Sequence, residues 1–223
     1  MTQYPPNNAG EMAARALRRG DATGWFEPLY ALAAPDGQGV PWARMQPDPA
    51  LAEWLAGVDG SGRAALVVGC GLGDDAEALA EASYAVTAFD VAPSAVALAR
   101  QRFPESRVTY ETADLFKPPK DWAGAFALVI ELLTVQSLPP ALHADAIRQI
   151  AGFVAPEGRA FVGSTVRIPE MDPTGPPWPV SAADMAVWGA AGLNTERTTK
   201  RAVGKWDRVW QVRTVYRRAT EAA

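Results

Sequence analysis

The sequence contains very few of the residues that build metal centres and covalent cross-links. Its 223 residues include one cysteine, Cys70, and one histidine, His143. A single cysteine excludes an intramolecular disulfide, and one residue of each kind leaves no cysteine and histidine cluster at metal-ligand spacing. The sequence therefore predicts neither a disulfide scaffold nor a metal site, and a chain of this length buries enough surface for a stable core without them.

Long hydrophobic runs and an excess of positive charge are also missing. The most apolar stretch, residues 125–138, is interrupted by Glu131 and is shorter than the roughly 20 residues of a membrane span. The 21 Lys and Arg against 25 Asp and Glu give a formal net charge of -4, which offers no general attraction for nucleic acid. We expect a cytoplasmic monomer or homodimer that acts on a small molecule and binds neither membrane nor nucleic acid.

The first sixty residues and the remainder show different patterns. Residues 11–19 and 24–33 favour helices, and a short helix is expected from Pro49 to before Gly60. We predict that residues 1–60 form an N-terminal helical cap and that this cap belongs to the same domain as residues 61–223.

From residue 61 onward, short apolar runs alternate with amphipathic segments, which is typical of βαβ units. Strands are predicted at residues 64–68, 85–90, 107–112, 125–131 and 157–165, with a terminal hairpin turning near Gly204. Helices are expected after Gly73, from Pro93, from Pro139 to Ile150 and, behind a Ser181–Asp184 capping box, to Gly192. The prediction is an α/β, Rossmann-like, doubly wound fold: a mostly parallel seven-stranded sheet with an antiparallel C-terminal strand.

A glycine-rich loop follows the first strand. The stretch LVVGCGLGDD places Gly69, Gly71 and Gly73 between a strand and a helix, where glycines allow a tight turn and a close approach to a ligand. Asp90 ends the next strand, where an acidic side chain can accept hydrogen bonds from both hydroxyls of a ribose. These features fit NAD or S-adenosylmethionine, and a tight turn without a ligand is the alternative.

The residues after the loop favour S-adenosylmethionine. The third, helix-packing glycine of the dinucleotide fingerprint is missing, and Asp74 and Asp75 would repel a pyrophosphate. A sulfonium that carries an amino group suits acidic surroundings, although either aspartate could simply complement the helix dipole. After the strand at 107–112, Asp114 can accept a hydrogen bond from the adenine amino group, or it can be a turn residue.

Three stretches, GCGLGDD, AFDVAPSAVALA and ADLF, resemble those of class I S-adenosylmethionine-dependent methyltransferases. Within that superfamily the chain is most similar to the thiopurine and halide/thiol methyltransferase group. This closer similarity rests on Trp25 with VPWA, on the aspartate four residues past the second glycine, on LPP, and on GPPWPVS. The resemblance implies methyl transfer from S-adenosylmethionine, with S-adenosylhomocysteine as the product.

The resemblance also implies positions for the site residues. The glycines would lie beneath the methionine part and Asp90 on the ribose. Further cofactor contacts are implied for Trp25, Trp42, Asp75, Val91, Asp114, Leu115 and Glu131. Candidate substrate residues are Leu132, Thr134, His143 and Trp178, with Asp172 and Trp178 as lid residues. The two N-terminal tryptophans could instead be core anchors, and His143 could face solvent.

Residues 132–135, LLTV, depart from the group, which tends to carry aromatic residues facing the acceptor, so thiopurine or halide specificity does not follow. Methyl transfer is an in-line displacement, and a thiol needs little base catalysis, whereas a hydroxyl usually needs a base. The similarity to this methyltransferase group implies sulfur as the first acceptor atom. The alternatives are an O- or N-methyltransferase of specialised metabolism and a non-catalytic S-adenosylmethionine-binding protein. His143 is the candidate base, and no residue is assigned as catalytic.

Overall fold

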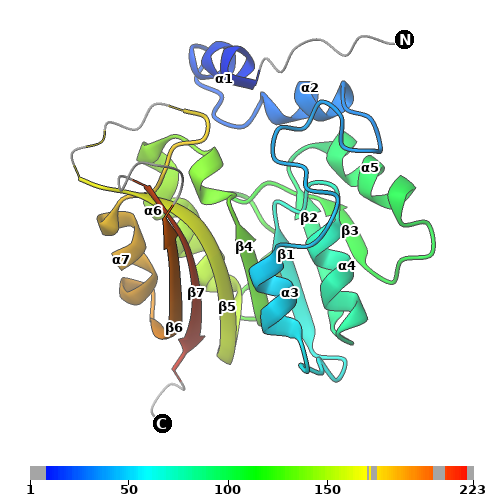
Figure 1. Ribbon diagram of the computed structural model, residues 1–223, viewed down its shortest axis with the longest axis vertical. Coiled ribbons are helices and arrows are strands. Elements are labelled where there is room, and N and C mark those ends of the chain that lie inside the picture. Colours follow the sequence, from blue (N-terminus) through cyan, green and yellow to red (C-terminus); the bar gives the residue numbers. More distant parts are fainter. Residues whose placement is uncertain (1–8, 170, 172–174, 203–208, 220–223) are drawn as a thin grey trace. The chain divides into compact units, whose positions relative to one another are not determined.

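The computed structural model describes residues 9–169, 171, 175–202 and 209–219 (Figure 1). Its strands are β1 (Ala64–Val68), β2 (Ala85–Asp90), β3 (Thr109–Thr112), β4 (Phe126–Leu132), β5 (Val154–Arg167), β6 (Leu193–Ala202) and β7 (Val209–Arg218). Its α-helices are α1 (Ala9–Leu17), α2 (Phe26–Ala31), α3 (Pro49–Leu55), α4 (Asp74–Glu81), α5 (Pro93–Arg102), α6 (Pro140–Phe153) and α7 (Ala182–Ala190). Two short 3-10 helices are η1 (Lys120–Trp122) and η2 (Val135–Ser137).

The strands form one sheet in the order β3-β2-β1-β4-β5-β7-β6. The pairs β2–β3, β1–β4 and β4–β5 are parallel, and β7 runs antiparallel to both β5 and β6. This arrangement confirms the predicted mostly parallel seven-stranded sheet with an antiparallel C-terminal strand. The turn expected near Gly204, like the candidate lid residue Asp172, lies outside the described residues.

Local sequence signals explain where most elements begin. Pro49 occupies the first turn of α3 behind Asp48, whose side chain accepts hydrogen bonds from two backbone N–H groups of that turn. Pro93 likewise occupies the first turn of α5, where Ala92 provides no side-chain cap. Before α7, Ser181 and Asp184 form the predicted capping box.

The start of β5 differs from the prediction. The strand was predicted to begin at residue 157, but β5 already begins at Val154, which pairs with Phe126. The register between β4 and β5 then shifts, and Glu157 adopts a left-handed φ of 61°. Pro156 and Gly158, which are typical of turns, therefore accompany an irregularity inside the strand and do not delay its start.

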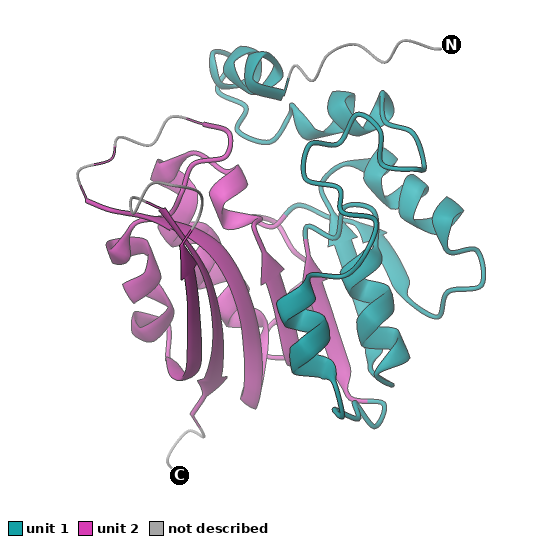
Figure 2. Cartoon of the chain, in the orientation of Figure 1, with its two compact units in different colours: residues 1–62, 69–114 teal, residues 63–68, 115–223 magenta. Residues whose placement is uncertain are grey.

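The chain divides into two compact units (Figure 2): residues 1–62 with 69–114 form unit 1, and residues 63–68 with 115–223 form unit 2. In unit 1, α2 packs on α5, and α3 packs on α4. In unit 2, α6 packs on β4, β5 and α7, while Trp188 stacks on Tyr216 with ring centroids 5.5 Å apart. The predicted division into a cap over residues 1–60 and a binding domain over 61–223 stays a prediction.

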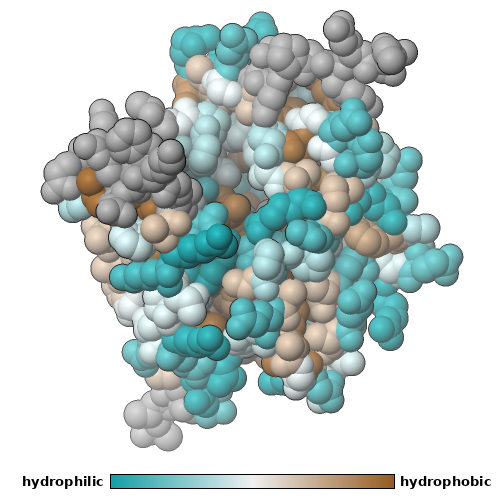
Figure 3. All heavy atoms as spheres, viewed as in Figure 1, coloured by the Kyte–Doolittle hydropathy of each residue, from teal (hydrophilic) through white to brown (hydrophobic). Residues whose placement is uncertain are grey.

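Within the described part of the chain, no helix is long and apolar enough to cross a membrane. On the face drawn in Figure 3, hydrophilic and hydrophobic residues are interspersed. Among the residues that the structure describes, the exposed large hydrophobic side chains are Leu32, Trp42 and Met45, and all three belong to unit 1.

Candidate functional site

The loop between β1 and α4 depends on its glycines. Gly69, Gly71 and Gly73 have φ values of 63°, 52° and 91°, in the left-handed region that favours glycine. A Cβ atom on Gly73 would lie 2.5 Å from the Tyr110 hydroxyl, and one on Gly71 would lie 2.9 Å from the Tyr30 hydroxyl. Both backbone conformation and space therefore require glycine here, and the loop presents bare backbone.

Asp90, at the end of β2, forms a hydrogen bond with this loop. One carboxylate oxygen accepts the N–H of Gly71 at 3.0 Å, and the other accepts the N–H of Ala92 at 3.0 Å. Its side chain is almost fully buried, and burial raises its pKa to about 6 against the hydrogen bonds that lower it. Each carboxylate oxygen keeps a second lone pair, so the group can still accept hydrogen bonds from a ligand.

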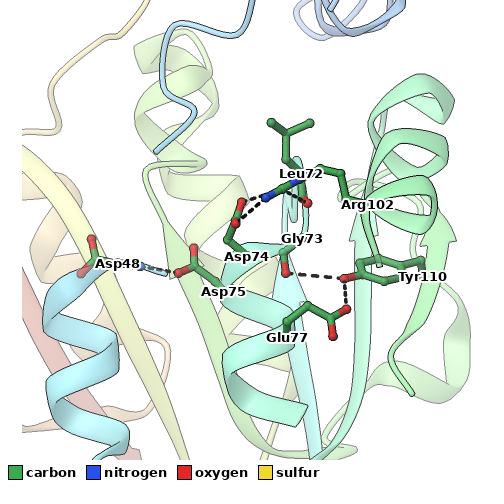
Figure 4. Close-up of polar contacts among 8 residues, drawn as sticks. All are labelled: Asp48, Leu72, Gly73, Asp74, Asp75, Glu77, Arg102 and Tyr110. Atoms are coloured by element: carbon green, nitrogen blue, oxygen red, sulfur yellow. Dashed lines mark hydrogen bonds and ion pairs between the residues drawn. The ribbon is translucent and has the colours of Figure 1, made fainter. Parts of the chain in front are cut away.

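The two aspartates after the loop contact other parts of unit 1 (Figure 4). Asp74 forms two hydrogen bonds of 2.7 Å with Arg102, which also donates to the carbonyl oxygen of Leu72. Asp75 accepts the backbone N–H of Asp48 at 2.7 Å, and burial raises its pKa to about 6. Both carboxylates thus hold protein groups, in addition to lying at the start of α4.

A third contact supports the loop from β3. The Tyr110 hydroxyl donates to Glu77 at 2.6 Å and lies 3.5 Å from the Gly73 carbonyl oxygen (Figure 4). Glu77 also accepts a hydrogen bond of 2.6 Å from the Ser106 hydroxyl. Tyr110 and Arg102 could not be predicted from the sequence, because their partners lie on another element and no local spacing relates them.

Aromatic residues of the N-terminal segment form one cluster. Trp25 stacks on Phe26 at 4.0 Å and meets Trp42 edge-on at 5.9 Å. Trp42 donates from Nε1 to the Tyr30 hydroxyl at 2.9 Å. Trp25 is 1% exposed, and its Nε1 has no hydrogen-bond partner among the described residues. Trp25 is therefore buried within this cluster and keeps an unused donor, whereas Trp42 lies at its exposed side.

The predicted adenine contacts follow the ends of β2 and β3. The N–H of Ala113 donates to the Asp90 carbonyl oxygen at 3.0 Å, so the chain around Asp114 continues the β2–β3 pairing. Val91 and Asp114 are both half-buried. Leu115 is buried and belongs to unit 2.

In unit 2, Glu131 lies opposite Val68 in the β1–β4 register, and Val68 directly precedes Gly69. The Glu131 side chain is fully buried, and its Oε1 accepts the N–H groups of Thr134 at 2.8 Å and Val135 at 3.0 Å. Its Oε2 has no hydrogen-bond partner among the described residues. Burial raises the pKa of Glu131 to about 7, although the charge of Arg213 acts to lower it.

His143 is fully buried, so the alternative that it faces solvent is wrong. Its Nε2 lies 2.9 Å from the Leu138 carbonyl oxygen and its Nδ1 lies 3.2 Å from a carboxylate oxygen of Asp184. Although burial raises the pKa of Asp184, hydrogen bonds from Ser181 and His143 lower it below its usual value. Both ring nitrogens are therefore engaged within unit 2, and neither is free to take a proton from a substrate in this arrangement.

The other candidate substrate residues also lie in unit 2. Thr134 donates from its hydroxyl to the Val68 carbonyl oxygen at 3.0 Å, and Leu132, at the end of β4, is half-buried. Trp178 is buried, and its backbone N–H donates to the Gln136 carbonyl oxygen at 2.6 Å.

The structure thus assigns the candidates to two groups. Unit 1 holds Trp25, Trp42, Gly69, Gly71, Gly73, Asp75, Asp90, Val91 and Asp114; unit 2 holds Leu115, Glu131, Leu132, Thr134, His143 and Trp178. Within the residues that the structure describes, no group of three or more His, Cys, Asp or Glu side chains could hold a metal ion.

Comparison with known proteins adds to this geometry. Residues 65–158 match the family model described as a methyltransferase domain. The chain is 29% identical over 164 residues to the ubiquinone biosynthesis O-methyltransferase of Bordetella avium, covering 72% of this chain and 61% of the relative. It is 32% identical to the protein of the same name from Xanthomonas axonopodis pv. citri, covering 75% and 64%. The chain therefore spans less than two thirds of the length of these curated relatives.

Solved structures show the same fold. A protein studied for the conversion of a disulfide bond into a thioacetal group during echinomycin biosynthesis superposes with a TM-score of 0.69 at 22% identity, covering 90% of this chain and 93% of its own. Magnesium protoporphyrin IX methyltransferase from Synechocystis PCC 6803, solved with bound S-adenosylmethionine, gives a TM-score of 0.60 at 20% identity and covers 76% and 77%.

Proposed function

We propose that this chain is a class I S-adenosylmethionine-dependent methyltransferase, which transfers the methyl group of S-adenosylmethionine to a small-molecule acceptor and releases S-adenosylhomocysteine. The observation that carries this proposal is the bond between Asp90 and the glycine loop. A carboxylate with free lone pairs lies beside bare backbone at the end of β2. That is the combination a nucleoside ribose and an adjoining charged tail require.

The proposed roles follow the sequence prediction. Asp90 accepts hydrogen bonds from the ribose hydroxyls, and Gly69, Gly71 and Gly73 lie beneath the methionine part. Val91, Asp114 and Leu115 contact the adenine. The unused Nε1 donor of Trp25 supports a cofactor contact from this residue, and Trp42 contributes to the same cover. For Asp75 we propose an indirect role, because its carboxylate already holds Asp48.

The chemistry asks little of the protein beyond placement. In-line displacement requires the nucleophile about 3 Å from the methyl carbon, opposite the departing sulfur. The protein holds both partners, excludes water and removes a proton where the acceptor is a hydroxyl. A thiol can react as its thiolate and needs no strong base. The presence or absence of a base therefore indicates the acceptor class.

Sulfur was the acceptor predicted from the resemblance to thiopurine and halide/thiol methyltransferases. A hydroxyl is the second candidate, and one observation favours it: a buried Glu131 oxygen has no hydrogen-bond partner in the part of the chain that the structure describes. Such an oxygen is costly to bury and is suited to accept a proton from a substrate. The names of the curated relatives, which are O-methyltransferases, support the same choice. Glu131 thus replaces His143 as the candidate base, because both His143 nitrogens are engaged.

The test is an acceptor panel. The purified protein is incubated with methyl-labelled S-adenosylmethionine and separate sets of thiols, phenols and amines, and methylated product is identified by mass spectrometry. Product from phenols that falls at least ten-fold in Glu131→Gln supports the hydroxyl assignment; product from thiols that is unaffected by Glu131→Gln supports sulfur. Binding of S-adenosylmethionine without product from any set overturns the proposal that the protein catalyses methyl transfer, and indicates a non-catalytic cofactor-binding protein.

A further inference from the structure

Tyr30 projects from α2 onto the glycine loop of unit 1. A Cβ atom built on Gly71 would meet the Tyr30 hydroxyl at 2.9 Å, with no other side chain as near. Gly71 is also the residue whose N–H is held by Asp90. The phenol therefore lies at the part of the loop where the methionine portion of the cofactor is proposed to bind.

The Tyr30 hydroxyl can still donate one hydrogen bond. Its oxygen accepts Nε1–H of Trp42 at 2.9 Å, and the ring is 3% exposed. Burial, followed by the charge of Asp90, raises the pKa of Tyr30 well above its ordinary value, so the group stays protonated. The Asp90 carboxylate accepts the N–H groups of Gly71 and Ala92, and the Tyr30 hydroxyl donates no hydrogen bond to any residue that the structure describes. A buried O–H donor without an acceptor is costly, which indicates a missing acceptor.

The position of Tyr30 is fixed by Glu27, three residues earlier on the same face of α2. The Glu27 carboxylate accepts the backbone N–H of Ser94 at 3.0 Å and the Ser94 hydroxyl at 2.6 Å. Ser94 lies in the first turn of α5, where a carboxylate also meets the positive end of the helix dipole. This contact attaches α2 to α5 and so holds Tyr30 over the loop.

We propose that Tyr30 is a cofactor-binding residue that donates a hydrogen bond to the carboxylate of the methionine part of S-adenosylmethionine, and that Glu27 is its positioning residue. The proposal rests on the proposed function. Of the polar groups in the methionine part, the carboxylate is the strong acceptor, whereas the ammonium group would oppose one donor with another. Tyr30 would thereby recognise the amino-acid end of the cofactor, separately from Asp90 and the ribose.

A comparison of two ligands tests this directly. Calorimetry measures the affinity of wild type and Tyr30→Phe for S-adenosylmethionine and for decarboxylated S-adenosylmethionine, which lacks only the carboxylate. We expect Tyr30→Phe to weaken S-adenosylmethionine binding about ten-fold and to leave the decarboxylated ligand unchanged. Equal weakening of both ligands, or of neither, overturns the proposal. Failure of wild type to bind either ligand would instead overturn the proposed function.

Matched variants separate this role from a merely structural one. Tyr216→Phe, at a buried tyrosine of unit 2, controls for loss of a hydroxyl and is expected to bind both ligands as wild type does. Glu27→Ala is expected to weaken S-adenosylmethionine selectively, and Glu27→Gln, which can still pair with Ser94, restores affinity. In Glu27→Ala combined with Tyr30→Phe, the losses should not add, because one acts through the other. Additive losses would contradict the positioning role.

Discussion

Asp75 accepts a hydrogen bond from the backbone N–H of Asp48, 27 residues earlier in the chain. Asp48 in turn caps the first turn of α3 and pairs with Arg44 at 2.8 Å. A residue that the sequence assigned to the cofactor therefore also connects α3 to α4. The Asp75 carboxylate thus links α4, the helix that follows the glycine loop, to the N-terminal cap of α3 within unit 1.

This contact predicts that Asp75→Ala and Asp75→Asn differ in stability. The alanine variant leaves the Asp48 N–H without its acceptor, and we expect a loss of about 1–3 kcal/mol in the free energy of unfolding. The asparagine variant keeps an acceptor oxygen and should recover most of that loss. Urea unfolding at pH 7 measures both. If the two variants unfold like wild type, the hydrogen bond to Asp48 has no part in holding α3.

The Asp74–Arg102 pair is expected to behave as a coupled unit. Two hydrogen bonds of 2.7 Å join side chains that are 16% and 11% exposed, and Arg102 also holds the Leu72 carbonyl oxygen. We predict that Asp74→Ala and Arg102→Ala each destabilise the protein, with a coupling energy of about 1–2 kcal/mol in the double-mutant cycle. Simple additivity of the two losses in chemical denaturation would contradict a coupled pair.

Trp25→Phe tests whether the unused indole donor serves a ligand. Removing a buried N–H that has no described partner should leave the thermal stability of the ligand-free protein unchanged or slightly higher. If the cofactor supplies the acceptor, the same substitution weakens S-adenosylhomocysteine binding several-fold. Melting curves with and without S-adenosylhomocysteine report both effects. Equal ligand-induced shifts in wild type and variant would make Trp25 a core anchor only.

Glu131 predicts a pH dependence of stability. Its pKa is raised in the folded state from 4.5 to about 7, so the folded protein binds the proton more tightly than the unfolded chain does. The associated stability is present below about pH 4.5 and is lost as the pH rises through about 7. Asp75 and Asp90, each raised to about 6, act in the same direction at lower pH.

Glu131→Gln should remove this component and keep the acceptor for Thr134 and Val135. The stability of the variant relative to wild type is therefore expected to increase between pH 5 and pH 8, by an amount on the order of 3 kcal/mol. Unfolding free energies measured across that range test the sign. If the difference in unfolding free energy between variant and wild type stays constant with pH, the pKa of Glu131 is not raised in the folded protein.

Much of the fold could be predicted because its signals are local. The bounds of β1 and β2, the starts of α4 and α5 and the Ser181–Asp184 capping box follow from apolar runs, glycine, proline and cap residues a few positions apart. The predicted start of β5 was wrong. Pro156 and Gly158, residue types that normally end a strand, are accommodated as an irregularity in the pairing of β5 with β4.

The candidate site was less predictable where its contacts are distant in sequence. Glycine spacing and the acidic residue at the end of β2 indicated Gly71 and Asp90, which the structure joins directly. Nothing in the spacing of Tyr30 or Glu27 relates them to Gly71 or Ser94, because α2 and α5 meet only in the folded unit. The burial of His143 was missed for the same reason: its partner Asp184 lies on α7.

The most direct test of the central claim is calorimetric titration of the purified protein with S-adenosylmethionine and S-adenosylhomocysteine, beside Asp90→Asn. The account predicts saturable binding of both ligands with one site per chain, lost or weakened at least ten-fold in a variant that remains folded by circular dichroism. Failure of the folded wild type to bind either ligand, or undiminished binding by Asp90→Asn, would contradict it.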